Sequence, residues 1–261
     1  MDLFLKGKVA MVTGAGGGMA KVIATTFAAE GADIVVAELD EARAQGTVDA
    51  CKALGVRAVP ALGSVTDKAV VDEMVQKAAG ELGKIDILVN AVGASMYTGT
   101  GAPGEFHTTT PQQWQQTLDF CFLAALNCTH AVLPGMIERK WGRVLNILSD
   151  AYKGRDKRMS LYGAAKAATN IWGKTMSMEL GKYNITVNAV APGATKTDTL
   201  AMVFDPQMAD MKQKMMKSYP LAAGRGDLGM PEDIANMVVF LCSDRASWVT
   251  GQAISVSGGF S

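Results

Sequence analysis

The chain has 261 residues, of which 49% are hydrophobic, and its 25 basic and 25 acidic side chains give a formal net charge of +0. A chain of this length can bury one large core, and its balanced charge does not favour binding to nucleic acid or to an anionic membrane surface. The four cysteines (Cys51, Cys121, Cys128 and Cys242) form no CxxC pair, so we expect buried free thiols and no metal site.

The N-terminal residues contain no apolar run of the length that a signal peptide needs. No stretch of the sequence is expected to reach transmembrane length. A soluble, cytoplasmic protein is the simplest expectation.

Short β-branched runs alternate with longer helical patterns along the chain. Strands are predicted at 8–13, 33–38, 57–62, 85–90, 143–148, 186–190 and 252–256. Helical patterns lie between them, near 18–30, 41–54, 67–82, 111–138, 160–181 and 231–242. The strands are continuously apolar, which is typical of parallel strands that helices cover on both faces. The sequence therefore predicts an α/β fold, a doubly wound parallel sheet of about seven strands.

One connection, at about 195–229, is too long for an ordinary link between a strand and a helix. We expect it to form a lid over a substrate pocket. Its methionines suit a flexible pocket ceiling. The spacing of Met208, Met211 and Met215 fits a buried helical face equally well.

The first predicted strand runs into a glycine-rich loop, Thr13-Gly14-Ala15-Gly16-Gly17-Gly18, which leads directly into a helix. Glycines at this place let the backbone approach a diphosphate at the N-terminus of the helix. Glu38 lies at the end of the second predicted strand, where a carboxylate can accept hydrogen bonds from ribose hydroxyls and would repel a 2′-phosphate. No Lys or Arg lies within the loop or at Leu39, so NAD is favoured over NADP. The alternative is that Glu38 is a solvated strand end.

Three residues have the chemistry that an alcohol needs when it loses a proton and a hydride. Tyr162 and Lys166 are four residues apart on a predicted helix and therefore share one face. An ammonium group beside a phenol favours the phenolate and lowers its pKa. Ser149, which precedes them, can hold a substrate oxygen while charge develops on it.

These features resemble the classical short-chain dehydrogenase/reductase family over essentially the full chain. The resemblance rests on ordered motifs that are specific for fold and cofactor class but not for substrate: the loop 13–18, Leu88–Gly93, Asn146–Ser149, Tyr162 with Lys166, Asn188–Gly193 and Gly251–Gly259. It implies a single Rossmann-fold domain over 1–261 that uses NAD and interconverts a secondary alcohol and a ketone. It also implies a homodimer or homotetramer formed through the two long helices near 111–138 and 160–181.

The resemblance also implies roles for individual residues. Tyr162 would be the general acid/base, Ser149 would hold the substrate oxygen, and Lys166 would lower the tyrosine pKa and bind the nicotinamide ribose. The cofactor would contact Gly14, Gly16, Gly17, Gly18, Met19, Glu38, Ser64, Val65, Asn90, Ala91, Gly93, Tyr162, Lys166, Pro192, Gly193, Thr195 and Thr197.

The chain departs from the family pattern at Ala20, Ser64, Ala91 and Cys121. At position 121 the family usually has an asparagine that supports a proton path from the lysine. A thiol is a weak hydrogen-bond partner and is not expected to fix a water or hold a helical kink open. Asn127 faces away and is not accepted as a substitute. These departures motivate the alternative of a catalytically weak or inactive subunit that supports an active partner in a hetero-oligomer.

Substrate contacts are expected from Ser95, Met96, Tyr97, Arg155 and Met202. A basic cluster, Lys153, Arg155, Lys157 and Arg158, suits a small anionic substrate such as a hydroxyacyl-CoA or a cyclic hydroxy acid. The alternatives are a merely solvated charge run, and a ketoreductase that accepts an acidic carrier protein and prefers NADP.

Overall fold

The structure is a computed structural model, and it describes residues 1–93, 104–154, 156–197, 205 and 208–260. Seven parallel strands form one sheet in the order β3-β2-β1-β4-β5-β6-β7. They are β1 Val9–Thr13, β2 Asp33–Glu38, β3 Ala58–Leu62, β4 Ile87–Asn90, β5 Gly142–Ile147, β6 Ile185–Pro192 and β7 Ala253–Val256. The predicted doubly wound sheet is confirmed.

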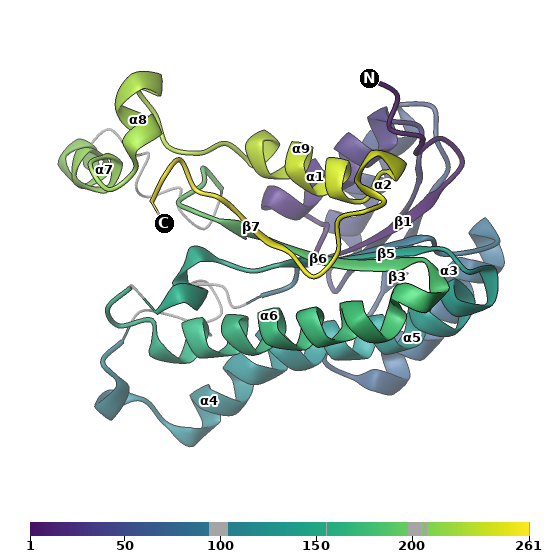
Figure 1. Ribbon diagram of the computed structural model, residues 1–261, viewed down its shortest axis with the longest axis horizontal. Helices are drawn as coiled ribbons and strands as arrows, with labels where there is room; N and C mark the ends of the chain where they lie inside the picture. The colour runs from purple at the N-terminus through teal and green to yellow at the C-terminus, as the bar shows by residue number, and fades with distance from the viewer. Residues whose placement is uncertain (94–103, 155, 198–204, 206–207, 261) are drawn as a thin grey trace.

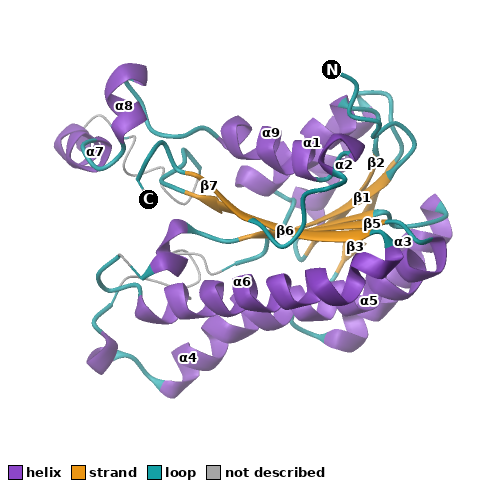
Figure 2. Ribbon diagram, in the orientation of Figure 1, coloured by secondary structure: helices purple, strands orange, loops and turns teal. Residues whose placement is uncertain are grey.

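Helices cover both faces of the sheet, as Figures 1 and 2 show. One layer contains α1 Gly18–Ala29, α2 Glu41–Lys52 and α9 Pro231–Leu241, and the other contains α3 Lys68–Leu82, α5 Ala124–Arg139 and α6 Ser160–Leu180. Alternate side chains of β1 feed the two cores: Ala10 and Val12 face the first layer, whereas Val9 and Met11 face the second. This explains why the strand reads as continuously apolar.

The long helical pattern near 111–138 is interrupted. Thr110 and Gln113 form a capping box that starts α4 Pro111–Leu118, and a π-helical turn at Asp119–Leu123 separates α4 from α5. Such a turn inserts one residue into the helix and is frequent at functional sites.

The same run corrects the expectation that no stretch reaches transmembrane length. By length and composition alone, Pro111–Arg139 is apolar enough to cross a membrane. Within the most apolar window 39% of the residues are buried inside the molecule, and Ala124, Cys128, Val132 and Met136 pack into the second core. Core helices of globular proteins pass the same test, so the composition of this run is weak evidence for a membrane span.

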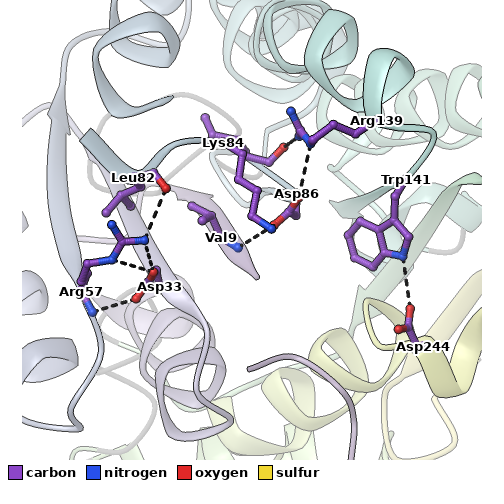
Figure 3. Close-up of polar contacts among 10 residues, drawn as sticks. Val9, Asp33, Arg57, Leu82, Lys84, Asp86, Arg139, Trp141 and Asp244 are labelled. Atoms are coloured by element: carbon purple, nitrogen blue, oxygen red, sulfur yellow. Dashed lines mark hydrogen bonds and ion pairs between the residues drawn. The ribbon is translucent and has the colours of Figure 1, made fainter. Parts of the chain in front are cut away.

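Polar contacts close the edge of the sheet at which the strands begin (Figure 3). Asp86 accepts a hydrogen bond from the backbone N–H of Val9 at 3.0 Å and pairs with Lys84 and Arg139. The Arg57 guanidinium pairs with Asp33 at the start of β2, with a shortest N–O distance of 2.6 Å. The carboxyl ends of all seven parallel strands lie at the opposite edge.

Two short helices, α7 Ala209–Met216 and α8 Pro220–Arg225, lie within the expected lid. The ends of the lid meet, because Thr195 and Gly229 form a parallel bridge. None of the α7 residues is buried, and Met208 and Met211 are exposed. The buried-helix interpretation of the lid methionines is therefore wrong.

Candidate active site

The candidate site lies where strand order reverses at the carboxyl edge of the sheet. β1 has β2 on one side and β4 on the other, so the loops after β1 and β4 diverge at this point. Doubly wound sheets bind ligands in that crevice. Ser149 follows β5 and caps a short 3₁₀ turn, Asp150–Lys153, while Tyr162 and Lys166 lie in the first two turns of α6.

Ser149 and Tyr162 are brought together as expected. Burial raises the pKa of Tyr162 well above its ordinary value, and a Coulombic contribution from Cys121 adds to the increase. The side-chain interaction with Ser149 has the smallest effect and lowers this pKa. Tyr162 is therefore a protonated phenol at neutral pH in the cofactor-free protein.

Lys166 is almost completely buried, at 3% exposure, and its ammonium donates a hydrogen bond of 2.7 Å to the carbonyl of Ile147. Burial lowers the pKa of Lys166. Its Nζ lies 5.9 Å from the centre of the Tyr162 ring. The expected lowering of the Tyr162 pKa by this ammonium is not among the contributions to that pKa, which burial dominates.

Cys121 lies inside the π-helical turn and is buried. The Thr169 hydroxyl lies 2.8 Å from the Cys121 carbonyl and 3.0 Å from the Ala165 carbonyl. The kink is present without an asparagine at 121, because the backbone forms the turn and Thr169 of α6 supplies a donor for the Cys121 carbonyl. That the thiol itself cannot hold the kink open stays a prediction. Asn127 donates to the carbonyl of Val65 at 3.2 Å, which agrees with its rejection as a substitute.

The glycine loop forms the expected cradle between β1 and α1. Gly14 and Gly18 have φ values of +67° and +52°, which favour glycine, and a Cβ on Gly14 would lie 3.1 Å from Val92. The Glu38 carboxylate accepts hydrogen bonds from the N–H groups of Gly16, at 2.9 Å, and Leu39, at 2.8 Å. The residues present therefore fit a dinucleotide whose diphosphate approaches the loop and whose ribose approaches Glu38.

The remaining expected cofactor residues lie along the same edge. Asn90 is buried and donates to Thr129 and Asn146. A Cβ on Gly93 would lie 3.0 Å from the Lys166 ammonium, so the loop after β4 passes directly over the lysine. Met19, Ser64, Ala91 and Thr197 are half-buried, whereas Val65, Pro192 and Thr195 are buried.

Two residues at this edge were missed by the sequence analysis. The Tyr219 hydroxyl accepts a hydrogen bond from the N–H of Ala194 at 3.0 Å, and its ring stacks on Phe260. A Cβ on Gly193 would lie 2.8 Å from the Tyr219 ring.

Arg43, in the first turn of α2, lies over the glycine loop. The available signal for Arg43 was a basic residue in the first turn of the helix that follows the strand-end acid Glu38.

The expected substrate residues Ser95, Met96, Tyr97, Arg155 and Met202 lie outside the described residues. Of the basic cluster, Lys153 pairs with the buried carboxylate of Asp150 at 3.1 Å and donates to Ser255 at 2.7 Å. Its charge is thus compensated within the protein.

Comparison with known proteins assigns the family. A family profile described as "Enoyl-(Acyl carrier protein) reductase" matches residues 14–261. The chain is 36% identical over 258 residues to the 7alpha-hydroxysteroid dehydrogenase of Escherichia coli K12, covering 99% of this chain and 96% of that protein. It is 34% identical to BbsD of Thauera aromatica, a subunit of a hydroxy(phenyl)methylsuccinyl-CoA dehydrogenase, over 98% of this chain and 97% of that protein.

A solved structure of 7alpha-hydroxysteroid dehydrogenase, in complex with NADH and 7-oxo glycochenodeoxycholic acid, superposes with a TM-score of 0.90 at 36% identity. The alignment covers 99% of this chain and 96% of that one. The fold, the carboxyl-edge site and these relatives define the class, an oxidoreductase that acts on CH–OH groups. The chain belongs to the short-chain dehydrogenase/reductase family.

Proposed function

We propose that the protein interconverts a secondary alcohol and a ketone, with Tyr162 as the general acid/base. The observation that carries this proposal is the close packing of the turn that begins at Ser149 against the start of α6, which holds Tyr162 and, one helical turn further, Lys166. NAD is the cofactor, and when bound it supplies or takes up the hydride.

Side chains of the protein transfer the proton to or from the substrate oxygen and hold that oxygen in position. In the reductive direction the Tyr162 hydroxyl donates its proton to the substrate oxygen, which the Ser149 hydroxyl holds in place. In the oxidative direction the tyrosine oxygen receives that proton. Lys166 lies next to Gly93 and the carboxyl end of β5, so its ammonium supports the ribose side of the site and the charge on the tyrosine oxygen.

For the substrate we propose a ring or chain hydroxyl on a molecule that also has a carboxylate or a coenzyme A thioester. The names of two relatives support this class: one was solved with 7-oxo glycochenodeoxycholic acid, and the other is a subunit of a hydroxy(phenyl)methylsuccinyl-CoA dehydrogenase. We further propose that 195–229 covers the substrate and that the protein is cytoplasmic.

We propose a homodimer or homotetramer that pairs the α4–α5 run with α6. Apolar side chains on this face are exposed: Ile171 and Met178, seven residues apart on one side of α6, together with Leu118 and Leu123. An interface would remove them from water.

The test combines binding with turnover. Calorimetric titration with NAD should give a micromolar dissociation constant. A panel of hydroxyacyl-CoA esters and cyclic hydroxy acids should then reduce NAD, and Tyr162→Phe should lower kcat by about 10²–10⁴-fold while NAD binding persists. NAD binding without turnover on any hydroxy substrate, in the wild type, would favour the alternative of an inactive supporting subunit.

A further inference from the structure

The first turn of α2 places a guanidinium over the glycine loop. Asp40 caps α2 by accepting a hydrogen bond from the Arg43 N–H at 2.9 Å, which fixes where the Arg43 side chain starts. Arg43 Cβ then lies 2.8 Å from the place that a Cβ on Gly16 would occupy. Its Nη2 lies 2.6 Å from the corresponding place on Gly17. Side chains on the loop would therefore occupy the space that Arg43 uses.

Glu38 borders the same space from the end of β2. Its Oε2 lies 2.5 Å from the Cβ place on Gly16. No ion pair joins Glu38 to Arg43, and the guanidinium makes no hydrogen bond to any other residue that the structure describes. Its positive charge is consequently available to a ligand at the loop.

These two residues combine chemistries that usually distinguish two cofactors. In doubly wound folds an acid at this strand end binds the ribose 2′-hydroxyl of NAD, whereas a nearby arginine accommodates the 2′-phosphate of NADP. We propose that Arg43 binds a 2′-phosphate at the adenosine ribose, so that this site takes NADP as a second cofactor despite Glu38. The inference rests on the proposed function, because it concerns the same nucleotide site.

A planar guanidinium can hold a phosphate through two parallel hydrogen bonds, which adds directional specificity to the charge. Arg43 reaches the loop from α2, although the loop itself contains no basic residue. An arginine could instead stack on the adenine ring. That contact would strengthen NAD and NADP binding equally, so the two cofactors distinguish the roles.

The experiment is a calorimetric titration of the full chain with NAD, NADP and 2′,5′-ADP, a nucleotide that has the ribose phosphate without the nicotinamide. The variants are Arg43→Gln and the matched control Lys52→Gln, which removes one exposed positive charge at the far end of the same helix. We expect Arg43→Gln to weaken NADP and 2′,5′-ADP binding by about tenfold or more, as for the loss of a charged hydrogen bond. NAD binding should change less than about twofold. Lys52→Gln should leave all three affinities unchanged.

A second pair of variants tests the balance between the two charges. Glu38→Gln removes the carboxylate that repels the phosphate, and it should strengthen NADP binding when Arg43 is present but much less in the Glu38→Gln/Arg43→Gln double variant. Arg43→Lys, which retains the charge but not the planar fork, should lie between wild type and Arg43→Gln.

Each other outcome overturns the inference. Equal weakening of NAD and NADP by Arg43→Gln would assign Arg43 to adenine stacking, and unchanged affinities would leave it no role in binding. Binding of NAD with no detectable binding of NADP or 2′,5′-ADP to the wild type would also overturn it, while the proposed function would stand. Failure to bind any of the nucleotides would instead reject the nucleotide site itself.

Discussion

The carbonyl oxygen of Ala151 lies 2.7 Å from the place that a Cβ on Gly163 would occupy. Gly163 follows Tyr162 on α6, and Ala151 follows Ser149 by two residues in the 3₁₀ turn. Because backbone oxygen and Cβ atoms do not approach this closely, only glycine allows α6 to pack against that turn without a shift. The contact therefore sets how near the Ser149 and Tyr162 hydroxyls can come.

Gly163→Ala should separate the two catalytic candidates. Either α6 or the 3₁₀ turn must move, so we expect a loss of about 1–3 kcal/mol in the free energy of unfolding and a fall in kcat/KM larger than the fall in NAD affinity. Denaturant unfolding and steady-state kinetics provide the measurements. The control is Gly80→Ala in α3, where a Cβ meets nothing within 4 Å and should stabilise the helix by about 0.5–1 kcal/mol. A Gly163→Ala protein as active as wild type would contradict this account.

Different pH profiles are expected for the two directions of the reaction. Burial raises the pKa of Tyr162 above its ordinary value, which is about 10, so the phenol is the acid form at neutral pH. Ketone reduction needs that acid form and should vary little between about pH 6 and pH 9. Alcohol oxidation needs the phenolate, so its kcat/KM should rise with pH over the same interval.

Ser149→Ala sharpens this test. The Ser149 hydrogen bond lowers the pKa of Tyr162, so its removal should move the oxidation profile further toward alkaline pH and lower the rate at neutral pH. Tyr162→Phe should lose about 10²–10⁴-fold in kcat at every pH. An oxidation rate independent of pH in the wild type would remove Tyr162 from the role of base.

Apolar runs predicted the strands well because burial on both faces is a strong local requirement. β2, Asp33–Glu38, matches its prediction at both ends. β6 extends from Ile185 to Pro192, beyond the predicted 186–190, because the ladder with β7 continues to the pair Pro192 and Val256. Pairing between distant segments is not visible in a local pattern.

The site shows the same division between local and spatial information. The spacing of Tyr162 and Lys166 indicated that the two side chains share one face of a helix. The fold brings Ser149, thirteen residues before Tyr162 in the sequence, to the same site as expected. The partner of the Lys166 ammonium is a carbonyl on β5, which no side-chain motif reveals. Arg43 was missed although it follows Glu38 closely in the sequence, because only the fold shows that its guanidinium lies over the loop. The π-helical turn was missed because one inserted residue hardly changes a helical apolar pattern.

Restoring an amide at position 121 tests the proton path. The turn already exists with Cys121, and Thr169 lies within hydrogen-bonding distance of its carbonyl, so Cys121→Asn should keep the fold while adding a donor and an acceptor near Lys166. We expect kcat to rise about 3- to 10-fold if proton delivery limits turnover, with a smaller solvent isotope effect. Cys121→Ala, which removes the thiol without adding an amide, serves as the control. An unchanged kcat in Cys121→Asn would show that the thiol does not impair the reaction.

The exposed apolar face of α6 predicts how copies of the chain associate. Ile171 and Met178 are 63% and 77% exposed, and burying each at an interface contributes about 1.5–3 kcal/mol. A twofold interface contains each residue twice, so Ile171→Glu should raise the dimer dissociation constant by about 100-fold or more. Sedimentation measures this as a shift toward monomer. Leu54→Glu, at an exposed apolar position just after α2, should leave the assembly unchanged. The same helices hold the candidate active site, because Cys121 lies in the π-helical turn and Tyr162 lies on α6. Dissociation to monomers should therefore lower kcat. An Ile171→Glu protein that sediments as wild type would place the interface elsewhere.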